Sequence, residues 1–214
     1  MTSRAHAHVA GIQRHLEAIY GLDRQEARAE RFLIGDDELD ALVRRGTIPA
    51  DASRPDEQLL VLPGDDGSSV ALYLSDRVQR GLEQGPSLQD HCHATEGVSH
   101  LLLLAWSGSE DRRVRPIELE LQAEVDKVGT SLLLLRSQGR RDATSQLRRL
   151  FVGAVMRRDL TADERARYRT AHRLGAEYAR RLTSLLDRGV EELLLELRRF
   201  YRLSGDAKLH RAAA

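Results

Sequence analysis

Apolar residues recur at helical spacing over most of this chain. In HVAGIQRHLEAIYGL, residues Val9, Ile12, Leu16 and Ile19 fall on one face of a helix, and Gly21 is a suitable end. The same reasoning predicts a short helix in DDELDALVRR and a helical chain after residue 74. We expect these later helices near residues 75–83, 88–106, 115–137, 142–157, 161–186 and 189–203.

A β-prone segment interrupts the helical pattern at about residues 57–74. The stretch EQLLVLPGDDGSSVALYLS holds two short apolar runs on either side of GDDG, and Asp66-Gly67 tolerates the positive φ of a hairpin turn. The fold class that we predict is mainly α, a helical bundle with one small β-hairpin. We expect a single domain over residues 1–214. Its first part, 1–86, would hold the N-terminal helix, an acidic loop and the hairpin, and 87–214 the helical bundle core.

Cysteine usage and the apolar runs bear on the environment of the protein. Cys92 is the only cysteine, so an internal disulfide is excluded and a metal site would rely on His and carboxylate ligands. The longest apolar runs, LLLLAW and SLLLL, fall well short of the ~20 residues that cross a bilayer, and the chain start lacks a secretory pattern. We therefore expect a cytoplasmic protein with no membrane partner.

The formal net charge of zero hides an asymmetry between the two halves of the chain. Residues 1–138 hold 15 Lys and Arg against 23 Asp and Glu, whereas residues 139–214 hold 18 against 10. The halves could pack on each other, or the arginine-rich C-terminal half could bind an acidic partner or nucleic acid. Acidic residues are interspersed among the arginines, which favours a solvated charged surface over nucleic-acid binding. Adjacent arginines occur at Arg140 and Arg141, Arg148 and Arg149, Arg157 and Arg158, Arg180 and Arg181, and Arg198 and Arg199.

The last predicted helix has an apolar face that something must cover. In GVEELLLELRRFYRL, this face holds Val190, Leu193, Leu194, Leu197 and Tyr201. Either the rest of the chain or a second subunit could cover it, so a homodimer through the C-terminal helices is one alternative.

The segment HCHATEGVSH, residues 91–100, holds the most suggestive chemistry. On a helix, His93, Glu96 and His100 are spaced i, i+3 and i+7 and share one face, which runs from an exposed start toward the apolar LLLLAW. Imidazole and carboxylate are suitable ligands for a divalent metal such as zinc, manganese or iron.

The next predicted helix offers further ligands. Glu120 and Glu124 lie one turn apart on the border of its apolar face, and the short connection SGSEDRR makes the two helices antiparallel, with Glu120 nearest His100. His172, on a face of small residues in a later helix, is an additional candidate ligand. The predicted metal ligands are His93, Glu96, His100, Glu120 and Glu124.

The sequence alone does not establish an activity, and two alternatives follow from it. If a metal binds, hydrolysis is the simplest reaction, with Glu96 or Glu124 as the base and arginines holding an anionic substrate. Otherwise the same residues are the charged border of a core helix and the protein is a non-enzymatic binding or regulatory protein. Neither the Glu-x-x-His pair of two-metal bundles nor the His-Glu-x-x-His of zinc proteases is present.

Two segments carry a resemblance to known sequences. EGVSHLLLLAW (96–106) and IELELQAEVDK (117–127) resemble a bacterial protein family to which no activity is assigned, and the resemblance extends to RRFYRL (198–203). It implies no mechanism, so no functional residue is carried over from it.

Overall fold

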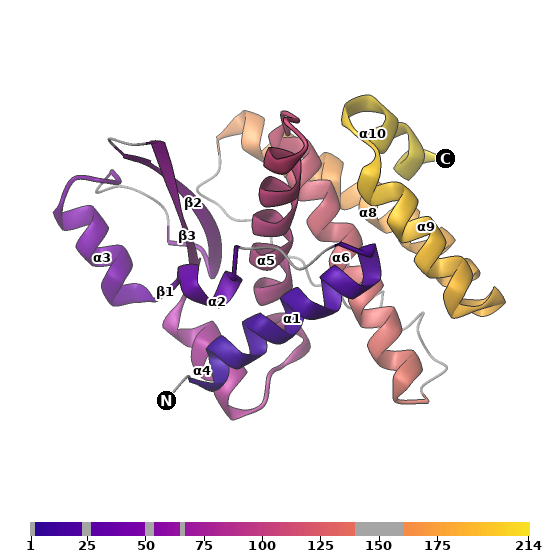
Figure 1. Ribbon diagram of the computed structural model, residues 1–214, viewed down its shortest axis with the longest axis horizontal. Coiled ribbons are helices and arrows are strands. Elements are labelled where there is room, and N and C mark those ends of the chain that lie inside the picture. Colours follow the sequence, from indigo (N-terminus) through magenta and orange to yellow (C-terminus); the bar gives the residue numbers. More distant parts are fainter. Residues whose placement is uncertain (1–2, 23–26, 50–53, 65–66, 140–160) are drawn as a thin grey trace.

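The computed structural model describes residues 3–22, 27–49, 54–64, 67–139 and 161–214 (Figure 1). The mainly helical fold and the hairpin are both confirmed. The helices of the described residues are α1 (Arg4–Tyr20), α2 (Ala29–Phe32), α3 (Asp36–Arg44), α4 (Asp76–Gln84), α5 (Leu88–Ser109), α6 (Pro116–Ser137), α8 (Ala162–Arg188), α9 (Val190–Arg202) and α10 (Gly205–Ala213). The strands are β1 (Leu33–Ile34), β2 (Glu57–Gly64) and β3 (Gly67–Leu74).

The sheet has three strands, one more than the sequence predicts. Its order is β1-β3-β2, with β2 antiparallel to β3 and β1 parallel to β3. In the hairpin, Glu57 lies opposite Leu74. The two-residue β1 is too short to show any periodicity, and the same holds for the four-residue α2. The prediction also missed α10, and the helix expected at 142–157 lies outside the described residues.

Helices α5 and α6 form the centre of the bundle (Figure 1). They are antiparallel, as predicted: His100 on α5 faces Glu120 on α6, and the earlier Glu96 faces the later Lys127. The hairpin packs against α5, α8 packs along α6, and α1 packs on α5 and α9. In the view of Figure 1, the sheet and α9–α10 therefore lie on opposite sides of the central pair.

Polar caps determine where the long helices begin. The Ser87 hydroxyl accepts from the backbone N–H of Asp90, whose carboxylate accepts in return from Ser87, forming a capping box at the start of α5. Thr161 and Glu164 form the same arrangement for α8. Pro116 occupies the first turn of α6, where its missing N–H costs nothing.

A buried polar network joins α1, α6 and α10. The side-chain amide of Gln122 donates to Tyr20 Oη at 3.0 Å and to Asp126 Oδ1 at 2.8 Å, and the Tyr20 hydroxyl also donates to Asp126. Lys208, which is fully buried, donates to Gln122 Oε1 at 2.7 Å. The network satisfies polar groups that would otherwise be costly to bury.

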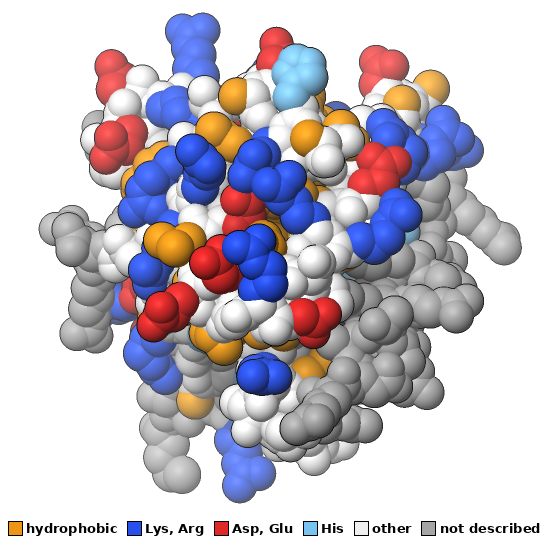
Figure 2. Space-filling view, turned by 90° about the vertical axis from the view of Figure 1, so that its right-hand side faces the viewer, with side chains coloured by type: hydrophobic (Ala, Val, Ile, Leu, Met, Phe, Trp, Pro, Cys, Tyr) orange, Lys and Arg blue, Asp and Glu red, His pale blue; other side chains and the backbone are white. Residues whose placement is uncertain are grey.

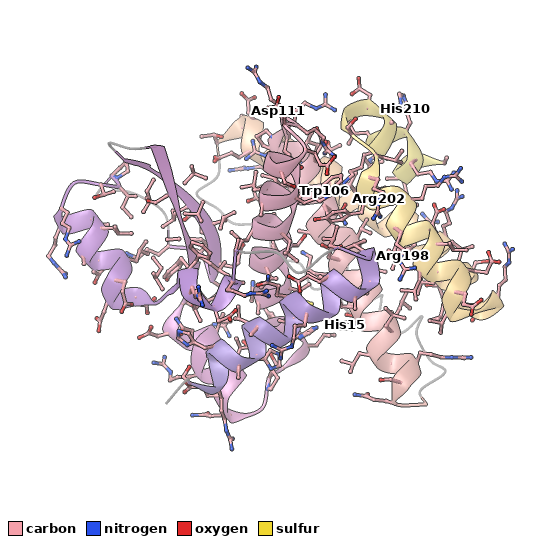
Figure 3. All side chains as sticks on the ribbon, in the orientation of Figure 1. His15, Trp106, Asp111, Arg198, Arg202 and His210 are labelled. Atoms are coloured by element: carbon pink, nitrogen blue, oxygen red, sulfur yellow. The ribbon has the colours of Figure 1, made fainter. Side chains whose placement is uncertain are left out.

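The C-terminal helices pack on the rest of the chain. Leu193, Leu197 and Phe200 of α9 are fully buried within it, whereas Leu195 is 62% exposed. Arg198 and Arg202 reach back to the end of α1, where they donate to the backbone oxygens of Ile19 and Tyr20 (Figure 3). Most of the predicted apolar face is thus covered without a second subunit, and the homodimer stays a prediction.

None of the helices in the described ranges combines the length and apolar character that a bilayer crossing demands.

The contact between α5 and the hairpin depends on Gly97. A Cβ at this position would overlap the Leu72 side chain and lie 3.0 Å from Glu57 Oε1. We expect Gly97→Ala to lower the free energy of unfolding by about 1–2 kcal/mol, since overpacking outweighs the gain in helix propensity. Gly108→Ala on the same helix, where a Cβ meets nothing within 4 Å, should raise it by about 0.5 kcal/mol. If urea unfolding showed the same increase in the free energy of unfolding for both variants, the close approach of the hairpin to Gly97 would be contradicted.

Candidate metal centre

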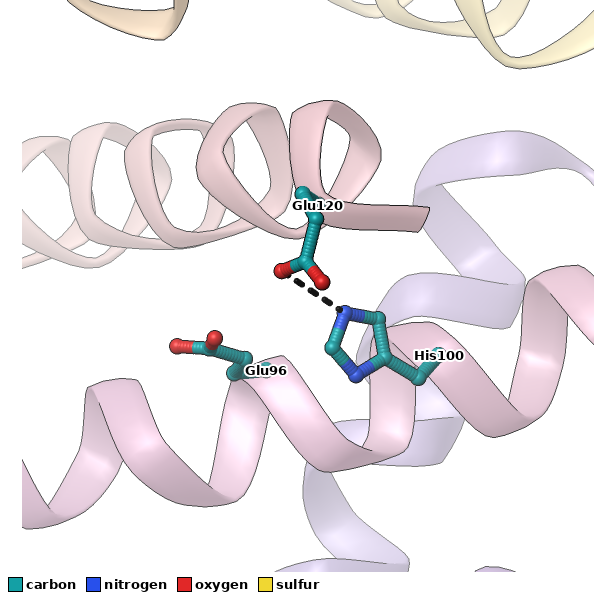
Figure 4. Close-up of side chains that lie close together, drawn as sticks. All are labelled: Glu96, His100 and Glu120. Carbon is teal, nitrogen blue, oxygen red and sulfur yellow. Dashed lines mark ion pairs between the residues drawn. The ribbon is translucent and has the colours of Figure 1, made fainter. Parts of the chain in front are cut away.

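Three predicted ligands meet in the seam between α5 and α6 (Figure 4). Glu96 and His100 lie one turn apart on α5, and Glu120 reaches across from α6. One ligand atom from each of the three lies within 4.8 Å of the other two. His100 and Glu120 are buried and Glu96 is partly exposed, so the group opens toward solvent on the Glu96 side.

The imidazole of His100 lies between two carboxylates. Its Nε2 is 3.9 Å from Glu120 Oε2, and its Nδ1 is 3.7 Å from Oε1 of Glu57, the first residue of β2. Both distances exceed those of ordinary hydrogen bonds. Nε2 and Glu57 Oε1 are buried and have no hydrogen-bond partner among the described residues. Such unsatisfied buried atoms are rare in folded proteins.

The surrounding charges displace the protonation equilibria of this group. Burial alone would lower the pKa of His100, but Glu57, Glu120 and Glu96 outweigh it and raise that pKa to about 9. Burial raises the pKa of Glu120 to about 7, against the opposing effect of His100. At neutral pH, His100 is therefore protonated and Glu120 is partly protonated.

A second ionic group adjoins the first. Lys127 Nζ donates to Glu96 Oε2 at 3.0 Å and to Glu124 Oε1 at 3.1 Å, and His172 Nδ1 lies 3.6 Å from Glu124 Oε1. Burial would raise the pKa of Glu124, but Lys127 and His172 reverse this and lower it to about 2. The two carboxylates raise the pKa of Lys127 despite its burial. Only 15% of the lysine side chain is exposed, so this ionic group is largely shielded from solvent.

Helix α8 closes the seam from a third side. Arg167 Nε lies 3.8 Å from Glu120 Oε1. Burial and the negative charge of Glu120 together raise the pKa of Tyr168. The site thus adds side chains from β2 and α8, which are distant in the sequence, to those of the consecutive helices α5 and α6.

The remaining predicted ligands lie beside the three-residue group rather than in it. His93 Nε2 is 3.8 Å from Asp56 Oδ2, and Glu124 and His172 pair with each other. His93 and His100 share a face but are separated by two turns, about 10 Å along the helix axis. A helical wheel gives the angle between side chains and not this axial distance.

The sequence argument did not include Glu57. Sequence periodicity gives no sign that the first residue of a strand contributes to a site between helices. Glu57 lies over α5 because the hairpin packs against that helix. Gly97, one turn before His100, is the one local signal, because a glycine inside a helix often permits close approach of another segment.

The other reactive side chains and the hollow beside α3 are weaker candidates for a functional site. Burial raises the pKa of Cys92 to about 12, which disfavours a nucleophilic thiolate. His8 Nε2 lies 3.4 Å from His91 Nδ1, a distance at which one imidazole donates weakly to the other.

A hollow between α3 and β2 is lined by Leu39, Val43, Ile48, Pro49, Arg54, Gln58 and Leu60. Its charged group, Arg54, is paired with Asp40.

Comparisons with known proteins give no further guidance. No protein-family model matches this chain, and neither the curated proteins nor the solved structures contain a match.

The raised pKa of His100 predicts how the stability of the metal-free protein depends on pH. Its favourable contribution is complete below the unfolded pKa of about 6.5 and is lost as pH rises through about 9. We expect the free energy of unfolding to fall by about 2–3 kcal/mol over this window. In His100→Gln the fall should largely vanish, whereas the exposed-residue variant His210→Gln should keep it. A wild-type profile that is flat between pH 6.5 and 9 in chemical denaturation would contradict the arrangement.

Proposed function

We propose that Glu96, His100 and Glu120 bind one divalent metal ion. The observation that carries the proposal is the convergence of three ligand atoms within 4.8 Å, combined with a buried His100 Nε2 that has no hydrogen-bond partner in the described part of the chain. A metal would give this nitrogen a partner.

The spacing is close to what an ion needs. With metal–ligand distances of about 2.0–2.2 Å, two ligand atoms on one tetrahedral ion lie about 3.3–3.6 Å apart. From the observed 4.8 Å limit, each pair of ligand atoms would need to approach by at most about 1.5 Å, a movement shared between two side chains. Imidazole with two carboxylates suits zinc, manganese or iron, and in zinc enzymes three protein ligands leave a position for water.

The charge around the cluster also supports a cation. Metal binding requires His100 to lose the proton that it holds in the metal-free protein. With His100 and His172 both neutral, the carboxylates exceed the cationic side chains by two negative charges, which one divalent ion balances. The carboxylates are Glu57, Glu96, Glu120 and Glu124, and the cations are Lys127 and Arg167.

We extend the proposal to metal-dependent hydrolysis. A divalent ion in this site would lower the pKa of a bound water and so supply a nucleophile near neutral pH. A pKa of about 2 makes Glu124 a weak base. Glu96, on the more exposed side, is the better candidate, and it would receive the proton through the carboxylate oxygen that does not bind the metal. Arg167 is placed to attract an anionic substrate to the metal.

The alternative of a basic surface for nucleic acid or an acidic partner has less support. On the face in Figure 2, the basic side chains of the described residues are interspersed with acidic ones. Several arginines are engaged within the chain: Arg181 and Arg211 with Glu196, Arg173 with Glu177, and Arg188 with Glu192. The arginine pairs between residues 140 and 158 lie outside the described residues.

Metal content tests the binding proposal. Tag-free protein incubated with zinc, manganese or iron and then desalted should retain near-stoichiometric metal by mass spectrometry. His100→Ala and Glu120→Gln each remove one ligand and should lose it, whereas His93→Ala should keep it, because His93 lies outside the cluster. Circular dichroism confirms that the variants fold. Absence of metal in the wild type, or retention by His100→Ala, would refute the site.

Hydrolysis needs its own test. The metal-loaded protein should cleave chromogenic phosphate or carboxylate esters, activity should disappear on chelation and return on adding metal, and His100→Ala should be inactive. Activity that survives chelation, or equal activity in the variant, would assign the hydrolysis to another site or a contaminant. Stoichiometric metal with no turnover of either ester class would leave metal binding intact and refute hydrolysis of these esters.

A further inference from the structure

We infer that Glu57 is the residue that positions His100 for metal binding: its carboxylate receives Nδ1–H of the imidazole and leaves Nε2 as the ligand atom. The inference rests on the proposed metal site and adds to it a residue from the β-hairpin.

The geometry of the ring supports this role. Nδ1 faces Glu57 Oε1 at 3.7 Å, while Nε2 faces Glu120 Oε2 at 3.9 Å. In Figure 4 the second ring nitrogen points away from Glu120. A histidine that binds a metal through one nitrogen commonly donates its other N–H to a carboxylate, which fixes the tautomer and the orientation of the ring. The contact needs to shorten by somewhat less than 1 Å to become an ordinary hydrogen bond.

The fold provides a specific place for this carboxylate. Glu57 begins β2, and its side chain is only 7% exposed. It lies against α5 at Gly97, where an added Cβ would be 3.0 Å from Oε1 and 3.2 Å from Cγ of Glu57. The absence of a side chain at residue 97 therefore leaves the space that brings the carboxylate beside His100.

The contacts of the neighbouring residues distinguish Glu57 from the other acids nearby. Glu96 and Glu124 are each held by Lys127, whereas Glu57 Oε1 has no hydrogen-bond partner among the residues that the structure describes. Asp56, the preceding residue, pairs with Arg77 at 3.0 Å and faces His93. Two carboxylates adjacent in the sequence thus face different histidines, which makes Asp56 a matched control for Glu57.

Glu57→Gln tests the inference, since it keeps the size of the side chain and removes its charge. With Zn²⁺ as the probe, competition titration should show an affinity about 10–100-fold weaker than that of the wild type. Asp56→Asn should leave the affinity unchanged. Glu57→Asp, which keeps the charge on a shorter side chain, should fall between wild type and Glu57→Gln, and it serves if the glutamine variant does not fold.

A second measurement separates positioning from a general structural effect. In the zinc-loaded wild type, ¹⁵N NMR of the His100 ring should show a protonated Nδ1 and a metal-bound Nε2. Thermal unfolding of each variant without metal reports its fold separately. Zinc affinity unchanged in Glu57→Gln, or zinc bound through Nδ1, would overturn the role of Glu57 while the metal site stands. A wild type that binds no zinc would overturn both.

Discussion

The burial of His100 and Glu120 in the seam between α5 and α6 is the constraint on which the charged side chains of this site depend. A carboxylate or an imidazolium removed from water is costly unless an opposite charge or a hydrogen bond compensates it. His100 and Glu120 are each 8% exposed, and compensation must therefore come from neighbouring side chains. The contacts with Glu57, Glu96 and Arg167 meet this need only partly, because the atoms lie beyond hydrogen-bond distance. This incomplete compensation distinguishes the group around His100 from a satisfied ion-pair network, and it is the reason for proposing a metal there.

The networks around Lys127 and Lys208 are held by ordinary hydrogen bonds, in contrast to the group around His100. Lys127 and Lys208 are the only lysines of the chain. Lys127 is 15% exposed between two carboxylates, and Lys208 is fully buried beside two carbonyl oxygens. Lys127 joins Glu96 to Glu124 at distances of ordinary hydrogen bonds, and Lys208 completes the network of Gln122. These networks hold α6 against α5 and α10. Satisfied polar contacts thus lie on either side of the seam around His100. His100 Nε2 itself has no hydrogen-bond partner among the described residues.

Much of this arrangement could be predicted from the sequence, and the failures have identifiable causes. Helical periodicity placed α4, α5, α6, α8 and α9 within three residues of their observed bounds, and the short link between α5 and α6 correctly paired His100 with Glu120. His93 lies outside the three-residue group because a shared angular position on a helix does not bring two residues together when they are two turns apart along the axis. Glu57 could not be predicted, since its part in the site depends on where the hairpin packs. The same limit applies to β1, whose two residues are strand only because β3 lies beside them.

Anomalous diffraction from crystals of the zinc-soaked protein, recorded at the zinc absorption edge, tests the central claim most directly. We expect one strong peak within bonding distance of Glu96, His100 Nε2 and Glu120, about 2.0–2.2 Å from each ligand atom. A peak at His93 and Asp56, or between His8 and His91, with none in the seam would contradict the account. So would a seam without zinc in which His100 donates to both Glu57 and Glu120, because the group would then be a complete ion-pair network with no place for a metal.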